Sequence, residues 1–182
     1  MSAPGAAAAQ ERAIGLARDA GRLLSVDPNF RPALWSERDA MVAASRDLVA
    51  RATIVKASAD ELQAMSGRDT IAAGVEALWH AGLRLFAVTS GAAGAELFTA
   101  ERRLAVPGFA VDAVDTTGAG DAFMACLLSE LLKAGLAFDD EAVLKQALSR
   151  AAVAGAITTT RRGAMGSMPD EGEITRFLAS RS

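Results

Sequence analysis

The 182-residue sequence is poor in cysteine, histidine and aromatic residues, and each shortage excludes a class of protein. Its one cysteine, Cys126, cannot form an intramolecular disulfide, which fits a reducing compartment. Its one histidine, His80, cannot build a metal cluster of the zinc type. Aromatic residues make up 5% of the chain and hydrophobic residues 51%, so we expect a core of small side chains and closely packed helices.

The sequence also lacks an excess of basic residues and any long apolar run. The net charge of −3 and the pI near 5.2 disfavour a nucleic-acid partner. The apolar stretch 125–136 is interrupted by Glu130 and Lys133, so we expect no membrane span and no membrane partner. Residues 1–9 carry no basic segment of the kind that opens a signal peptide. We therefore expect a cytoplasmic protein.

Helical and strand-like segments alternate along the chain. The expected helices cover 6–22, 36–51, 59–65, 70–80, a stretch after Gly120, 140–158 and 171–178, and the expected strands cover 23–26, 53–56, 85–89, 95–99 and 102–106. Ser36 is the expected cap of the second helix. This alternation favours an open, mostly parallel α/β sheet, which binds ligands at the carboxyl ends of its strands. We expect a motif directly after each of four strands, from Asp27, Lys56, Thr89 and Asp115 onwards.

The strongest signal is segment 114–123, VDTTGAGDAF. Gly118, Ala119 and Gly120 leave backbone N–H groups bare at the positive end of a helix dipole, which predicts an anion site. Asp121 would repel a phosphate there unless it had a role, and a carboxylate beside a transferring phosphoryl group can accept the proton of an attacking hydroxyl. The alternative is a plain helix start in which Asp121 compensates the dipole. Phe123 replaces the third glycine of a dinucleotide fingerprint, which excludes a dinucleotide-dependent oxidoreductase.

The string DTTGAGDAF resembles the C-terminal signature of the PfkB, or ribokinase-like, family of carbohydrate kinases. Four other segments resemble family motifs in the same order. Segment 27–35 (DPNFRPALW) is similar to the DPNxRxxLW segment of fructokinases and 2-keto-3-deoxygluconate kinases. Segment 56–62 resembles the region around their NxxE motif, with Ser58 in place of asparagine. Segment 88–94 (VTSGAAG) resembles the VTxGxxG nucleotide loop, and segment 159–169 the closing loop near the nucleotide. The resemblance implies a three-layer α/β/α fold and an ATP-dependent kinase acting on a ketose or keto sugar acid.

The resemblance also implies site residues. Asp121 would be the catalytic base, with Gly118, Ala119 and Gly120 as the anion hole. The implied ATP-binding residues are Lys56, Thr89, Gly91, Gly94, Ala152, Gly155 and Gly163. Asn29 and Arg31 would join Asp121 in binding the substrate, and Glu61 would act on Mg²⁺ through water. Asp115, Thr117, Gly163 and Ser167 fall where some family members hold a monovalent cation such as K⁺.

Purely structural roles are the alternative to several of these assignments. Asn29 and Arg31 could cap a loop, Lys56 could face solvent, and Glu61 at a helix start suits the helix dipole.

The N-terminal part of the family and its small β lid are expected to be missing, leaving residues 1–182 as one truncated domain. An edge of the sheet would then lack its neighbour, so we expect a homo-oligomer. The alternative function is a nucleotide-binding remnant or interaction domain without sugar turnover.

Overall fold

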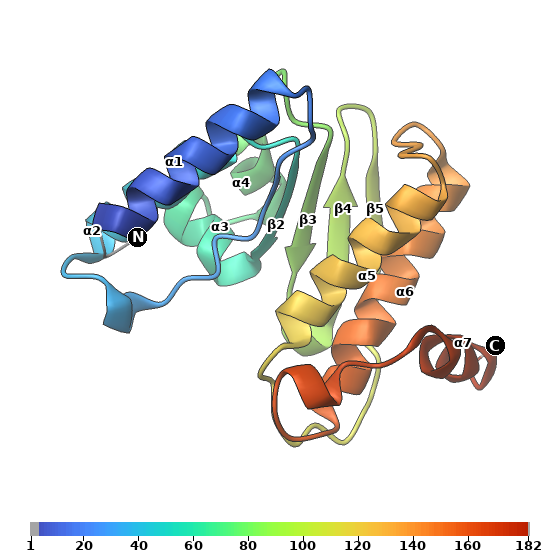
Figure 1. Ribbon diagram of the computed structural model, residues 1–182. Helices are drawn as coiled ribbons and strands as arrows, with labels where there is room; N and C mark the ends of the chain where they lie inside the picture. The colour runs from blue at the N-terminus through green and yellow to red at the C-terminus, as the bar shows by residue number, and fades with distance from the viewer. Residues whose placement is uncertain (1–3, 182) are drawn as a thin grey trace. The chain divides into compact units, whose positions relative to one another are not determined.

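The computed structural model describes residues 4–181, which hold seven α-helices and five strands (Figure 1). The alternation of helices and strands confirms the α/β fold class, and the strand pairs are both parallel and antiparallel. The chain divides into two compact units, Met1–Val88 and Thr89–Ser182, which are described in turn. The single domain over residues 1–182 stays a prediction. Within residues 4–181, no helix combines the length and the apolar character that crossing a membrane requires.

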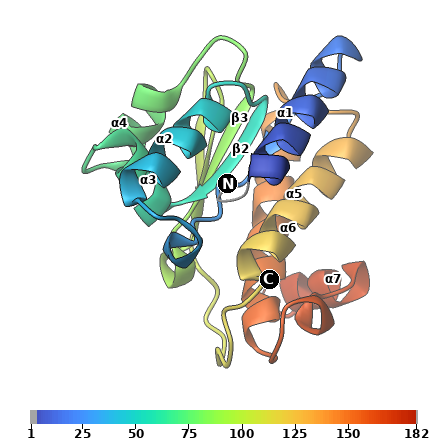
Figure 2. The same ribbon diagram turned by 60° about the vertical axis from the view of Figure 1, so that its left-hand side comes forward.

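The first unit begins with an alanine-rich helix and continues as alternating strands and helices. Its elements are α1 (Pro4–Asp19), β1 (Ser25–Val26), η1 (Pro32–Leu34), α2 (Arg38–Val49), β2 (Ile54–Ser58), α3 (Ala59–Ser66), α4 (Ile71–Leu78) and β3 (Leu85–Thr89), whose last residue opens the second unit. The strands lie in the order β1-β2-β3, and β1 is parallel to β2. Helices α2, α3 and α4 lie beside one another in both ribbon views (Figure 2).

Local capping explains where α3 begins and shows one wrong prediction at α2. Ser58 and Glu61 form a reciprocal capping box that starts α3, and Gly67 ends it at φ 67°. The N-cap of α2 is Glu37, without a side-chain hydrogen bond, so the predicted Ser36 cap is wrong. Ser36 lies one residue outside the cap position, where its hydroxyl does not receive the first helical N–H groups.

The second unit combines a β-hairpin with three helices. Its elements are η2 (Gly91–Ala93), β4 (Ala95–Phe98), β5 (Arg103–Val106), α5 (Ala119–Lys133), α6 (Glu141–Thr159), η3 (Met165–Ser167) and α7 (Glu171–Ala179). Strands β4 and β5 pair antiparallel, from Ala95 opposite Val106 to Phe98 opposite Arg103, as the hairpin prediction required. Helices α5 and α6 lie side by side in Figures 1 and 2.

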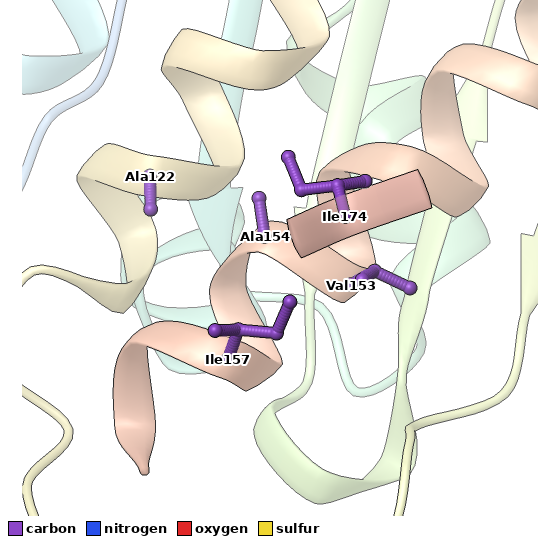
Figure 3. Close-up of a cluster of buried hydrophobic side chains, with 5 residues drawn as sticks. All are labelled: Ala122, Val153, Ala154, Ile157 and Ile174. Atoms are coloured by element: carbon purple, nitrogen blue, oxygen red, sulfur yellow. The ribbon is translucent and has the colours of Figure 1, made fainter. Parts of the chain in front are cut away.

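Small side chains let the helices of the second unit approach closely. A Cβ atom on Gly155 of α6 would lie 3.2 Å from the carbonyl oxygen of Ala119 on α5. Ile174 of α7 completes a buried cluster whose other members are Ala122, Val153, Ala154 and Ile157 (Figure 3). Here the expected core of small residues and tightly packed helices is confirmed.

The expected strand before Asp115 is wrong, because residues 107–118 form no strand. The backbone N–H groups of Val114 and Asp115 both donate to the carbonyl oxygen of Thr159, at 2.7 and 3.1 Å. This segment is therefore tied to the last turn of α6. A helix C-terminus offers carbonyl groups without intrahelical partners, and this loop uses one of them.

Candidate active site

A cavity of about 550 Å³ lies within the second unit. Seven of the predicted ATP-binding and anion-hole residues line it: Thr89, Gly91, Gly94, Ala119, Gly120, Ala152 and Gly155. None of its lining residues carries a charged side chain. Cavities that hold small molecules span roughly 300–1,000 Å³ and are mostly apolar, so the size and lining fit a nucleotide.

Two glycines bring backbone segments together on one side of this cavity. Gly94 has φ 108°, and a Cβ atom there would lie 2.1 Å from the carbonyl oxygen of Val106. A Cβ atom on Gly108 would lie 1.9 Å from the carbonyl oxygen of Ala92. No side chain fits at either position without moving the backbone, so glycine permits this part of the wall to form.

The residues of the predicted anion hole lie at the start of α5. Gly118 is the N-cap at φ 82°, and a Cβ atom there would lie 3.1 Å from Cα of Ala164. The N–H of Ala119 donates to Thr116 at 3.3 Å, and the N–H of Ala122 donates to Gly118 at 2.9 Å. Helix geometry leaves the N–H groups of the second and third helical residues, Gly120 and Asp121, without a partner inside the helix. They provide two donors beside the cavity wall that Gly120 lines.

Asp121 lies in the first turn of α5 with an exposed side chain. Neither Asp121 nor Gly118 lines the cavity itself. The carboxylate is therefore accessible to a reactant at the helix start, and its role as base stays a prediction.

Hydrogen bonds connect the four residues predicted to hold a monovalent cation. The Asp115 carboxylate accepts from the N–H of Thr117 at 2.9 Å and from the N–H of Gly163 at 3.0 Å. The Ser167 hydroxyl donates to the carbonyl oxygen of Gly163 and, at 2.8 Å, to that of Ala164. The Thr117 hydroxyl and these N–H donors lower the pKa of Asp115 to about 2, so it is ionised at neutral pH.

Charged side chains hold the loop of residues 27–31 in the first unit. Lys56 is 6% exposed and pairs with Asp27 at 3.0 Å. The two carboxylate oxygens of Glu61 accept from the N–H of Phe30 at 2.7 Å and from the N–H of Ser58 at 2.8 Å. Lys56 is therefore buried, and Glu61 ties this loop to the start of α3.

The same loop presents the two residues predicted to bind substrate. Asn29 adopts the left-handed conformation at φ 46°, which is uncommon for a residue other than glycine. Asn29 and Arg31 both line a second cavity, of about 460 Å³, within the first unit. The two predicted substrate residues thus share one cavity.

Two predicted ATP-binding residues lie outside the nucleotide-sized cavity. Lys56 belongs to the first unit and pairs with Asp27, while Gly163 takes part in the hydrogen bonds around Asp115. Their ATP roles stay predictions.

Sequence reasoning missed the loop that forms one wall of the cavity. The missed lining residues include Gly108, Phe109, Ala110, Val111 and Ala113. Only Pro107-Gly108 signals a turn in this stretch. Nothing local indicates that the loop faces a cavity.

Comparison with known proteins agrees with the motifs. Residues 1–171 match the pfkB family of carbohydrate kinases. A curated relative, fructokinase-1 of Zea mays, is 40% identical over 168 residues, which cover 92% of this chain and 52% of the relative. The chain spans about half the length of the curated relatives it matches.

Solved structures of similar proteins contain nucleotide and metal ions. A double mutant of fructokinase from Vibrio cholerae O395, solved with fructose, ADP and potassium ion, has a TM-score of 0.85 and 35% identity, covering 94% of this chain and 55% of its own. A putative ribokinase II from E. coli, in complex with ATP and Mg²⁺, has a TM-score of 0.80 and 27% identity, covering 94% and 53%. These likenesses agree with a ribokinase-like fold.

Proposed function

This chain belongs to the pfkB family of carbohydrate kinases, and we propose that it acts in ATP-dependent transfer of the γ-phosphoryl group to a hydroxyl of a ketose or keto sugar acid. One observation carries the proposal: residues from three family motifs line a single cavity of nucleotide size at the start of α5. A helix start with a purely structural role would not require residues from separate motifs to line one cavity.

The apolar part of the cavity suits the base of ATP and its glycine-rich part suits the phosphates. Ala152 and Gly155 of α6 offer a flat wall to adenine. Thr89, Gly91 and Gly94 allow the ribose and phosphates to approach the backbone closely. The likeness to kinases solved with ATP or ADP supports this orientation.

The start of α5 would stabilise the transferring phosphoryl group. The N–H groups of Gly120 and Asp121, together with the helix dipole, favour the negative charge that spreads over its oxygens. Asp121 accepts the proton of the attacking sugar hydroxyl as the phosphorus–oxygen bond forms, and ADP leaves with the electrons of the broken bond.

Magnesium fits this scheme through Glu61 and water. The described residues contain no group of three or more His, Cys, Asp or Glu side chains placed to hold a metal ion by themselves. Each carboxylate oxygen of Glu61 accepts one backbone N–H and retains a second lone pair for a water ligand. Mg²⁺ bound with the nucleotide would be held by Glu61 through water and would neutralise negative charge on the phosphates.

A monovalent cation such as K⁺ would be held by the loops around Asp115. The Asp115 carboxylate stays ionised and the carbonyl groups of residues 163–164 lie beside Ser167. Oxygen donors of this kind suit a hard cation. The potassium ion in the similar fructokinase supports this assignment.

Asn29 and Arg31 would bind the sugar, because they share a cavity and belong to a loop that Lys56 and Glu61 hold through Asp27 and Phe30. The fructose in the similar fructokinase favours a ketose. Self-association also belongs to this proposal, since Leu16, Leu23 and Leu34 of the first unit are 53, 45 and 63% exposed.

Calorimetry with ATP and ADP, followed by phosphorylation assays on a panel of ketoses and keto sugar acids, tests the proposal on the purified chain. We expect nucleotide binding and ATP-dependent phosphorylation of at least one ketose. Binding without turnover would favour a nucleotide-binding module that needs another polypeptide for catalysis. Absence of nucleotide binding would contradict the proposal.

A further inference from the structure

The wall loop, residues 107–113, has neither helix nor strand, although five of its residues line the proposed nucleotide cavity. Gly108 anchors its beginning against Ala92, and Val114 anchors the residues after it to Thr159. Between these points, Phe109 and Ala110 need support from elsewhere to hold one conformation.

The C-terminal helix provides that support through two residues. The ring of Phe177 on α7 meets the ring of Phe109 edge to face, with centroids 5.6 Å apart and planes at 84°. Arg181, two residues beyond the end of α7, donates from Nη2 to the carbonyl oxygen of Ala110 at 2.9 Å. Its guanidinium also lies 5.1 Å from the centre of the Phe177 ring, which links the two contacts.

Helix α7 is itself firmly attached. Ile174 is 5% exposed and packs on Val153, Ala154 and Ile157 of α6 (Figure 3). The first turn of α7 is closed by a capping box between Asp170 and Glu173. The helix is thus a stable base from which Phe177 and Arg181 reach the wall loop.

We infer that α7 positions the wall of the nucleotide cavity, with Phe177 and Arg181 as positioning residues for the wall loop; this rests on the proposed function. Neither residue faces the cavity. Both lie beyond residue 171, where the match to the family ends. Fixing the loop before the nucleotide arrives removes an ordering cost that binding would otherwise bear.

The first arm of the test needs no nucleotide. Hydrogen–deuterium exchange of the free chain compares the wild type with Phe177→Ala and Arg181→Ala. We expect faster exchange in residues 107–113 in both variants, while α5 and α6 keep wild-type exchange. Arg176→Ala is the matched control, because Arg176 lies on the same helix with its guanidinium against Gly172. Exchange in 107–113 that matches the wild type in both variants would overturn the inference.

The second arm measures ADP binding by calorimetry on the same proteins. If about one residue of the wall loop loses its order in the free chain, the dissociation constant for ADP rises about tenfold. We expect this rise for Phe177→Ala and Arg181→Ala, no change for Arg176→Ala, and partial recovery in Arg181→Lys, which keeps a donor. Since Phe177→Ala could unfold α7, Arg181→Ala at the exposed chain end is the decisive variant.

The two hypotheses fail in different ways. If every variant bound ADP as tightly as the wild type, the role of α7 would be overturned and the proposed function would stand. A wild-type chain that does not bind ADP would contradict the proposed function and remove this role for α7 with it.

Discussion

The cavity of the second unit proposed to bind nucleotide and the 27–31 loop of the first unit are built in opposite ways. The cavity is lined by small, uncharged residues and depends on glycines where backbones nearly touch. The loop is held by two charged side chains, the buried Lys56 and the partly buried Glu61. We therefore expect that adding one methyl group to a cavity glycine disrupts the cavity, whereas removing the charge of Lys56 or Glu61 disrupts the loop.

Gly108→Ala should have the largest effect. Its new Cβ would lie 1.9 Å from the carbonyl oxygen of Ala92, so the backbone must move. We expect a loss of at least about 3 kcal/mol of unfolding free energy, the upper range for overpacking, together with loss of ADP binding. Chemical denaturation and calorimetry measure both. Gly15→Ala, where a Cβ meets nothing within 4 Å, should be tolerated.

Lys56→Met should come next, because it removes the cation that pairs with the largely buried Asp27 at 3.0 Å. Breaking a buried ion pair in this way costs about 3–5 kcal/mol. Urea denaturation of Lys56→Met and of the double variant Lys56→Met/Asp27→Leu checks this, since the double variant should recover much of the loss. A double variant no more stable than the single one would argue against the ion pair as the reason.

Glu61→Gln should have a smaller effect. The amide can accept one of the two N–H groups that Glu61 now binds, so either Phe30 or Ser58 loses its acceptor. An unsatisfied N–H of this kind costs about 1–3 kcal/mol. Thermal unfolding measures it, with Glu76→Gln on the exposed face of α4 as control. Equal stability of the two variants would show that the carboxylate does not anchor the loop.

The smallest expected effect is a pH dependence from Asp115. Hydrogen bonds lower its pKa from 3.8 to about 2 in the folded chain. Because the folded pKa is the lower one, the contribution to stability is present above pH 4 and lost as pH falls through about 2. Denaturation of the wild type between pH 4 and 2 should show a steeper loss than Asp115→Asn. Parallel curves would contradict the assigned hydrogen bonds.

Local signals in the sequence predicted much of this fold. The hairpin 95–106 and the helices after Gly120 follow from strand propensity, glycine positions and caps. The glycine-containing start of α5 was predicted because Gly118, Ala119 and Gly120 stand together there.

Long-range contacts account for what the sequence did not reveal. Lys56 is buried against its partner Asp27, which lies 29 residues away in the chain, so no local pattern indicates this pair. The wall loop contacts Phe177 and Arg181, and the hydrogen bond from Arg181 to Ala110 spans 71 residues. The wrong strand before Asp115 has the same origin, since that segment bonds to Thr159. No local pattern encodes such pairings.

Asp121 is proposed to be the base of phosphoryl transfer beside the cavity of the second unit. The most direct test compares ATP-dependent ketose phosphorylation by the wild type, Asp121→Asn and Asp139→Asn. Asp139 is the control, because it is exposed and lies in the loop between α5 and α6. We predict that Asp121→Asn binds ADP like the wild type but turns over about 100- to 10,000-fold more slowly, as loss of a general base implies. Wild-type turnover in Asp121→Asn would contradict the claim.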